Sequence, residues 1–217
     1  LTGEDNNAAL GSTGVTVNSG ASLGSYGNRT YSVPVTLNTG ASMHNNGGGT
    51  GIWSGTVNLA GNATANAGSG DIRYTGVVSG AGTLSKTGAN WVLLTNSGNT
   101  FSGGVNVSGG YLRFNGDGAL GTAPGSPATN ITLQSGGRTQ AGTDVAGVNA
   151  TLNANRSISL PSGDGYFQVW TGFTMNVPGA ISGAGTLVKS DGGTLNDSGT
   201  GSAGNTRIEG GTLQLSG

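Results

Sequence analysis

The sequence predicts an all-β fold, a right-handed parallel β-helix (β-solenoid) of about ten rungs. One long unit occurs twice, because the hexapeptide Ser79–Leu84 returns unchanged at Ser182–Leu187. A shorter rhythm runs inside each unit, since Val15–Leu23 is echoed twenty positions later by Val35–Met43. No helical pattern separates these segments. Units that recur at fixed spacing stack on their neighbours, which predicts an elongated rod rather than a domain built around one pocket.

The expected strands follow one another at intervals of about twenty residues. Each alternates apolar residues with Thr, Ser or Asn and then breaks at Gly or Asn, a pattern typical of short, half-buried strands. The strands expected from this pattern are 15–23, 35–43, 57–63, 77–81 and, at the end of the chain, 212–217. The Gly-Ala-Gly triplets at 80–82 and 183–185 are expected to mark corners, where a side chain would collide with the adjacent turn.

Recurring blocks also set the limits of the long units. Two blocks besides the hexapeptide return in the same order: Gly109–Phe114 as Gly210–Leu215, and Ala9–Gly11 as Ala119–Gly121. We therefore expect a first long repeat at 1–114 and a second at 115–217, continuous with the first. Because the opening segment resembles the residues after the first repeat, we also expect the chain to be a window of a longer array.

Composition excludes several classes of function. The 217 residues include 46 Gly and 5 Pro, only 8% are charged, and the net charge is −1. Weak self-repulsion and apolar residues in register favour an ordered chain. The eight Lys and Arg residues form no basic cluster for phosphate binding, so we expect no nucleic-acid partner. The chain has no cysteine, and no apolar run is long enough for a membrane span in this segment.

Candidate catalytic and metal-binding groups are sparse, so we expect no enzyme, no cofactor and no metal site. His44 is the single histidine, and no nucleophile–acid pair lies near it in the sequence. A glycosidase-type carboxylate pair would require Asp71, Asp144 and Asp164 to converge from distant turns. Asp-Gly at 117–118 and 164–165 is typical of tight turns and lacks the spacing of a calcium loop.

The stretch Ser79–Phe114 carries a longer motif. Its motif residues are Leu84, Lys86, Gly88, Val92, Leu94, Asn99, Phe101, Gly103, Gly104, Val107, Gly110 and Leu112. They match the pattern G-x-G-x-L-x-K-x-G-x-x-x-L-x-L-x-G-x-N-x-[YF]-x-G-G-x-x-[IV]-x-x-G-x-L. The stretch resembles the passenger-associated transport repeat, also called the autotransporter-associated β-strand repeat, of bacterial surface proteins. The segment Ala119–Arg138 is similar to the linker between such repeats.

The second copy of the motif is less complete. It keeps Leu187, Lys189, Gly193, Leu195, Asn205, Ile208 and Gly211-Thr212-Leu213. It has Asn205-Thr206-Arg207 in place of the aromatic residue and the Gly-Gly pair. The resemblance implies a right-handed parallel β-helix outside a bacterial cell, usually a stalk or passenger, with no fixed activity. Lys86 and Lys189 follow strands in register, and we expect both to be solvated corner charges.

Period-two alternation predicts which side chains reach the surface. Residues expected to face the core are Val92, Leu94, Leu112, Phe114, Phe167, Val169 and Phe173. Residues expected to face outward, as a surface-contact site, are Trp91, Leu93, Tyr111, Arg113, Tyr166 and Trp170. Exposed aromatics on a rigid sheet suit sugar rings or a neighbouring fibre. The alternative is that they pack under a loop such as Gly121–Pro127 or cover neighbouring rungs.

These observations predict a non-enzymatic structural repeat region of an extracellular or bacterial cell-surface protein. It would act as a rigid stalk or fibre in adhesion or a biofilm matrix. The alternatives are a glycan-binding adhesin module that uses the outward aromatics and, third, a polysaccharide-degrading β-helix enzyme. Since end rungs expose unpaired backbone groups, we expect end-to-end self-association into filaments. Other expected partners are a surface polysaccharide or a host receptor.

Overall fold

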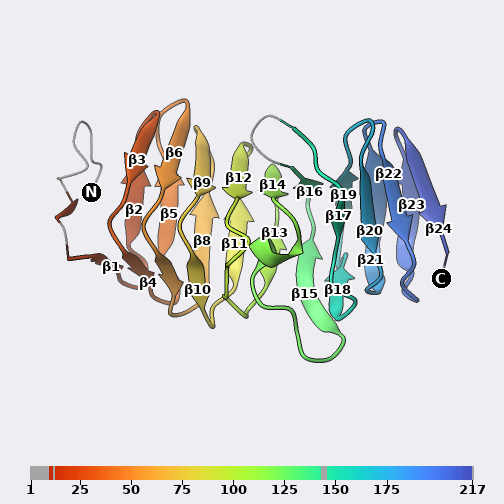
Figure 1. Ribbon diagram of the computed structural model, residues 1–217, viewed down its shortest axis with the longest axis horizontal. Helices are drawn as coiled ribbons and strands as arrows, with labels where there is room; N and C mark the ends of the chain where they lie inside the picture. Colours follow the sequence, from red (N-terminus) through yellow and green to blue (C-terminus); the bar gives the residue numbers. More distant parts are fainter. Residues whose placement is uncertain (1–9, 12, 143–145, 217) are drawn as a thin grey trace.

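The computed structural model describes residues 10–11, 13–142 and 146–216. They form a stack of parallel strands, a β-solenoid of about nine turns, which lie side by side along the long axis (Figure 1). The described residues contain no α-helix, although a short 3₁₀ helix, η2 (Asp117–Leu120), occurs midway along the chain. None of the helical structure in this part of the chain is long and apolar enough to cross a membrane. The predicted fold class is therefore confirmed. The opening residues 1–9 lie outside the described part of the chain.

Each turn contributes strands to three faces, and the strands of a face pair in parallel with those of adjacent turns. Face A consists of β2 (Ser22–Ser25), β5 (Ser42–Asn45), β8 (Ala63–Asn66), β11 (Leu84–Thr87), β13 (Val105–Val107), β15 (Ala128–Leu133), β18 (Arg156–Ser159) and the first part of β21 (Ile181–Ser190). Face B is made of two four-stranded sheets: β1 (Val15–Val17), β4 (Val35–Leu37), β7 (Val57–Leu59) and β10 (Val78–Gly80), then β17 (Ala150–Thr151), β20 (Thr174–Val177), β22 (Thr194–Asp197) and β24 (Thr212–Leu215). Face C consists of β3 (Arg29–Tyr31), β6 (Thr50–Trp53), β9 (Asp71–Tyr74), β12 (Trp91–Leu94), β14 (Tyr111–Phe114), β16 (Gly137–Ala141), β19 (Asp164–Gln168), the last part of β21 and β23 (Ala203–Ile208).

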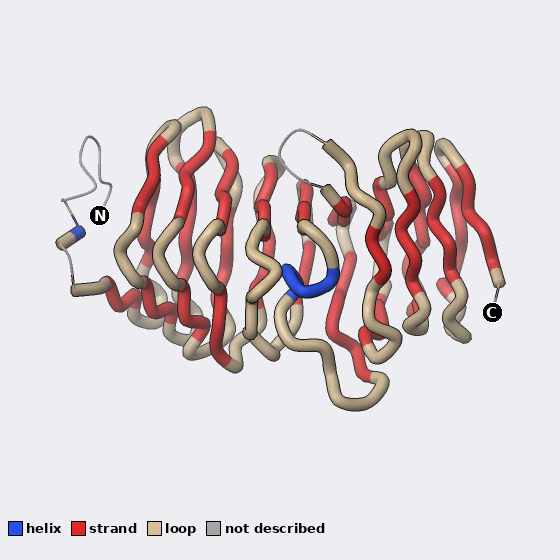
Figure 2. Tube along the Cα trace, viewed as in Figure 1, coloured by secondary structure: helices blue, strands red, loops and turns tan. Residues whose placement is uncertain are grey.

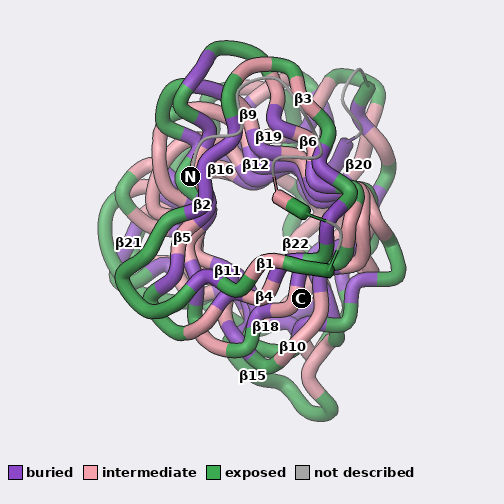
Figure 3. The backbone as a smooth tube through the Cα atoms, turned by 90° about the vertical axis from the view of Figure 1, so that its left-hand side faces the viewer, coloured by how far each residue is buried: buried purple, intermediate pink, exposed green. Residues whose placement is uncertain are grey.

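In-register pairing places like residues in columns inside the coil. On face B, Val15, Val35, Val57 and Val78 are successive partners. On face C, the inward column runs through Tyr31, Trp53, Tyr74, Leu94 and Phe114. The rings of Tyr31 and Trp53 stack with centroids 4.6 Å apart. Buried residues line the inside of the coil, and exposed residues lie on its outside (Figure 3).

The predicted core residues are largely confirmed. Six of them are buried inside the coil: Val92, Leu94, Leu112, Phe114, Phe167 and Val169. Phe173 is only partly buried, although it packs against the core. The strands predicted from the twenty-residue rhythm are also present, because β1, β4, β7 and β10 lie within 15–23, 35–43, 57–63 and 77–81.

The two copies of the long unit do not occupy the same faces. Leu84 on face A connects through four successive pairings, with Val105, Ile131, Ile158 and Ile181, to the start of β21. The sequence counterpart of Leu84 is Leu187, which lies further along β21 and pairs with β19 on face C. The second copy is therefore displaced from the first by four turns and one additional face.

The Gly-Ala-Gly triplets mark corners in both copies, as predicted. Residues 80–82 join face B to face A, while 183–185 lie inside β21, where it passes from face A to face C. A Cβ atom added to Gly82 would lie 2.0 Å from the carbonyl oxygen of Gly61, and one added to Gly183 would lie 2.3 Å from that of Leu160. Direct contact with the preceding turn therefore requires glycine at these two positions.

Lys86 and Lys189 are buried, so the prediction of solvated corner charges is wrong. The Nζ of Lys86 donates to the carbonyl oxygens of Thr87 at 2.7 Å, Gly88 at 2.7 Å and, in the next turn, Gly109 at 3.0 Å. Lys189 makes the same three bonds, at the same three distances, to Ser190, Asp191 and Gly210. At a corner the strand ladder is interrupted, and an ammonium group supplies the donors that its carbonyls lack.

In the described part of the chain, face B has no strand between β10 and β17, and side chains take over its hydrogen bonds there. The Oδ1 of Asn99 accepts from the Val78 N–H at 2.8 Å, and its Nδ2 donates to the Ala119 carbonyl at 2.7 Å. The buried Arg156 binds the Asp117 carboxylate of η2 at 2.8 Å and donates to the carbonyls of Leu120 and Gly121. This connection explains why η2 and the loop after it replace a strand on the near side of the coil (Figure 2).

Replacing Lys86 with Met should lower the free energy of unfolding by roughly 2–4 kcal/mol, because corner carbonyls lose their donor inside the protein. Chemical denaturation of the 217-residue chain would measure the change. Ser85→Ala, on the outer side of the same strand, is the matched control and should shift stability by less than about 0.5 kcal/mol. Equal stability of the two variants would contradict the structural role of the buried ammonium group.

The stability contribution of Lys86 should also depend on pH. Burial lowers its pKa from 10.5 to about 8, so between these values the unfolded chain binds more protons than the folded chain. The natural protein should therefore become more stable relative to Lys86→Met as the pH increases from 8 to 10.5. The quantity compared is the free energy of unfolding of the two proteins. Denaturation curves across this range would test the sign, and a difference that fell with pH would contradict it.

Candidate functional site

The outward side chains of face C form a column of mostly aromatic and basic residues. Strand register makes Trp91, Tyr111, Arg138, Tyr166, Val188 and Arg207 successive neighbours on β12, β14, β16, β19, β21 and β23. They share one side of the sheet because each occupies the same phase of the period-two alternation. We call the outward surface from β12 to β23 the arginine–aromatic face.

Ring stacking and cation–π contacts connect the members of this column. The rings of Trp91 and Tyr111 stack with centroids 4.0 Å apart. The guanidinium carbon of Arg138 lies 3.6 Å from the centroid of Tyr166 and 5.6 Å from that of Tyr111. Each such contact contributes about 0.5–1 kcal/mol at an exposed site, so the column is ordered without being essential to the fold.

Arg113 lies in a second outward column, beside Leu93, and its contacts connect this column to the first. Its guanidinium carbon lies 4.0 Å from the centroid of Trp91 and 4.9 Å from that of Trp170, and its Nε donates to Gln140 Oε1 at 2.7 Å. Trp170 follows β19, so residues from four successive turns meet around this side chain. The contacts leave Arg113 only 7% exposed, and Leu93 beside it only 6% exposed.

The predicted surface residues therefore divide into two groups. Trp91, Tyr111, Tyr166 and Trp170 are partly exposed, while Leu93 and Arg113 are covered despite their outward phase. The alternative of a covering loop at 121–127 stays a prediction. The Gly121 and Pro124 carbonyls of that loop accept from Arg156 and Asn155.

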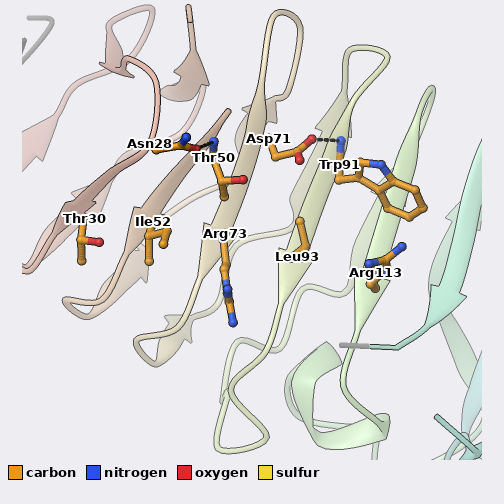
Figure 4. A pocket seen from close by; sticks show the side chains of 9 residues that line it. All are labelled: Asn28, Thr30, Thr50, Ile52, Asp71, Arg73, Trp91, Leu93 and Arg113. Carbon is orange, nitrogen blue, oxygen red and sulfur yellow. Dashed lines mark hydrogen bonds between the residues drawn. The ribbon is translucent and has the colours of Figure 1, made fainter. Parts of the chain in front are cut away.

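A shallow groove of about 400 Å³ adjoins the arginine–aromatic face. Its lining comes from β3 to β14 and comprises Asn28, Thr30, Thr50, Ile52, Asp71, Arg73, Trp91, Leu93 and Arg113. These side chains form two rows that cross five successive strands of face C (Figure 4). The groove therefore runs along the axis of the solenoid, across its strands.

The carboxylates of face C are engaged by protein groups. Asp71 Oδ1 accepts from the backbone N–H of Trp91 at 2.9 Å. Arg207 forms ion pairs with Asp164 at 2.6 Å and with Glu209 at 3.0 Å. The hydrogen bond from Arg207 holds the pKa of Asp164 below its ordinary value.

No catalytic constellation is evident in the described part of the chain. Asp71 and Asp164 begin strands β9 and β19, which three strands of face C separate, and Asp144 lies outside the described residues. The described residues also bring no three His, Asp or Glu side chains together around a common point. Burial lowers the pKa of His44, which lies on face A, away from these acids.

Sequence reasoning missed Arg138 and Arg73 as members of the outward surface. A signal for Arg138 was present, because Gly136-Gly137-Arg138 repeats the arrangement of Gly109-Gly110-Tyr111, and the register confirms that Arg138 and Tyr111 are partners. The irregular spacing between these segments obscured it. Arg73 could have been placed by the same period-two rule that placed Leu93, its partner in β12.

Comparison with known proteins gives one informative match. The chain is 30% identical over 142 residues, or 64% of its length, to the adhesin BmaC autotransporter of Brucella suis biovar 1 (strain 1330). The match spans 4% of that protein's length. No family model matches the sequence, and no solved structure matches it. The similarity supports a relation to autotransporter surface proteins, while the particular repeat family expected from the motif stays a prediction.

Replacing Arg138 with Gln should lower the free energy of unfolding by only about 0.5–1 kcal/mol, since it removes cation–π contacts at the surface. Denaturation of this variant beside Lys86→Met would rank the two sites. A loss from Arg138→Gln as large as that from Lys86→Met would mean that the arginine–aromatic face chiefly stabilises the fold.

Proposed function

We propose that this chain is a stiff, non-catalytic segment of a bacterial cell-surface or extracellular protein, and that it contributes to adhesion. The observation that carries the proposal is the stack of turns whose strands pair continuously along face C, where their outward side chains form a column of mostly aromatic and basic residues. The similarity to part of an autotransporter adhesin supports the same role.

The geometry suits a spacer. With about 4.8 Å between adjacent strands, the nine turns extend roughly 40–45 Å. Because every turn is tied to the next by parallel ladders on its faces, the rod resists bending more than a flexible linker of equal length would. A segment of this kind holds whatever adjoins it at a fixed distance and exposes its own faces along the way.

A second candidate function is glycan binding by the arginine–aromatic face. It is favoured by the partly exposed rings of Trp91, Tyr111, Tyr166 and Trp170, which the structure brings to one side of the rod. The third candidate, polysaccharide cleavage, has less support, because Asp71 and Asp164 are separated by three strands and each already binds a protein group.

The adhesive role predicts that beads coated with the 217-residue chain attach to host-cell monolayers or to biofilm matrix. Soluble chain in excess should compete and reduce attachment, and beads coated with albumin provide the background. Digests of the matrix incubated with the chain should show no new reducing ends. Attachment no greater than that of albumin-coated beads on both surfaces would contradict adhesion, and new reducing ends would favour the enzyme.

End-to-end association of the isolated chain is a further prediction. Strands β23 and β24 each pair on one side only, and Ile208 and Leu215 nearby are 55% and 72% exposed. An exposed sheet edge can pair with another chain, so light scattering should show mass that grows with protein concentration. A strictly monomeric chain at all concentrations would count against filament formation.

A further inference from the structure

The basic side chains outside the interior all belong to face C. Three of the eight Lys and Arg residues are buried inside the coil, and they are Lys86, Arg156 and Lys189. The other five lie on face C: Arg29 of β3 is in register with the inward Ile72 and Val92, whereas Arg73, Arg113, Arg138 and Arg207, on β9, β14, β16 and β23, have the outward phase. In a chain of which only 8% is charged, this placement concentrates guanidinium groups on one side of the rod.

Acidic residues on the same face do not offset this charge evenly. Asp164 and Glu209 both pair with Arg207, near the C-terminal end of the face. Asp71 is bound to the Trp91 backbone N–H at the groove. Between Trp91 and Tyr166, the outward columns hold Tyr111, Arg113, Arg138, Gln140 and Leu93 and no carboxylate. Among the described residues, the outward columns in the middle of the face therefore contain arginines and no carboxylate.

Arg138 is placed to bind an external anion. Its contacts in the described part of the chain are the rings of Tyr166 and Tyr111, and none of the ion pairs there includes it. A guanidinium group that stacks on a ring keeps its N–H edge in the plane of the group, where it can donate two parallel bonds to a carboxylate or sulfate. The stacking thus orients Arg138 without occupying its donors.

The shape of the site favours a linear ligand. The groove crosses five strands from β3 to β14, and the arginine–aromatic column continues from Trp91 through Tyr166 in the same direction. At about 4.8 Å per strand, the groove alone extends roughly 19 Å along the axis. Arg73 and Arg113 line it, and Trp91 and Tyr111 offer rings beside it.

We propose that the groove and the part of the arginine–aromatic face from Trp91 to Arg138 together bind a linear anionic polysaccharide that lies along the solenoid axis. Carboxylate or sulfate groups on the sugars bind Arg73 and Arg138, and sugar rings pack against Trp91 and Tyr111. This inference rests on the proposed adhesive function and names the class of ligand that this face recognises.

The test is titration of the complete 217-residue chain with oligosaccharides of equal length, followed by calorimetry and tryptophan fluorescence. Alginate fragments supply carboxylates alone, heparin fragments supply sulfates in addition to carboxylates, and dextran fragments are neutral. Alginate, heparin or both should bind more weakly as salt rises, and dextran should not bind. Which of the two anionic sugars binds more tightly identifies the preferred group.

Variants locate the site. Arg73→Gln and Arg138→Gln should each weaken binding roughly tenfold, the effect of one lost charge-assisted bond pair. Arg207→Gln is the matched control, since Asp164 and Glu209 already engage that side chain, and its affinity should stay within about twofold of the natural protein. The small stability change expected for Arg138→Gln separates lost binding from lost folding.

Several results would overturn the inference. Equal binding of dextran would show recognition without charge, and equal binding of single-stranded DNA would show charge without sugar recognition. Loss of affinity in Arg207→Gln as large as in Arg138→Gln would move the site away from the groove. If no anionic sugar binds, the inference fails, whereas bead attachment that persists would leave the adhesive function standing.

Discussion

In-register pairing of each turn with the next is the constraint on which this structure depends. Strands inside each sheet take their backbone partners from the turns before and after them, so like positions form columns along the axis. The columns explain how a chain with few large apolar residues folds, because one or two inward side chains per strand suffice to fill the coil. They also explain why the outward side chains of face C lie in rows, since the ladder that stacks Val92 on Leu112 inside stacks Trp91 on Tyr111 outside.

Corners are where the ladder cannot provide partners, and the repeated motif encodes a corner rather than a face. Lys86 lies on face A and Lys189 on face C, yet each donates to two carbonyls of its own corner and one of the next turn. The corner residue is in the left-handed region in both copies, with φ of 80° at Gly88 and 62° at Asp191. A motif that involves only one corner and the facing carbonyl of the next turn can recur after any number of faces. This independence allows turns of different length between the two copies.

The sequence predicts the parts of this architecture that depend on neighbours along the chain. Period-two alternation correctly places Leu94 and Phe114 inside, and the Gly-Ala-Gly triplets correctly mark corners. It does not predict that Lys86 is buried, because the Gly109 carbonyl that binds it comes from the following turn. For the same reason the covered state of Arg113 was missed, since Trp91 and Trp170 reach it from different turns. Contacts between turns depend on turn length, which varies most around η2, where the repeating pattern is weakest.

Successive turns of this protein stack in one fixed register, and engineered disulfides provide a direct experiment on that register. The chain has no cysteine of its own, so a double substitution introduces the only thiols. Ser22 and Ser42 are register partners whose Oγ atoms lie 2.7 Å apart, whereas Thr64 lies one turn beyond Ser42. The double variant Ser22→Cys and Ser42→Cys should close a disulfide rapidly under mild oxidation. The double variant Ser22→Cys and Thr64→Cys should not, because these positions lie two turns apart. Equal closure of the two pairs, or closure of the second pair alone, would contradict the stacked register.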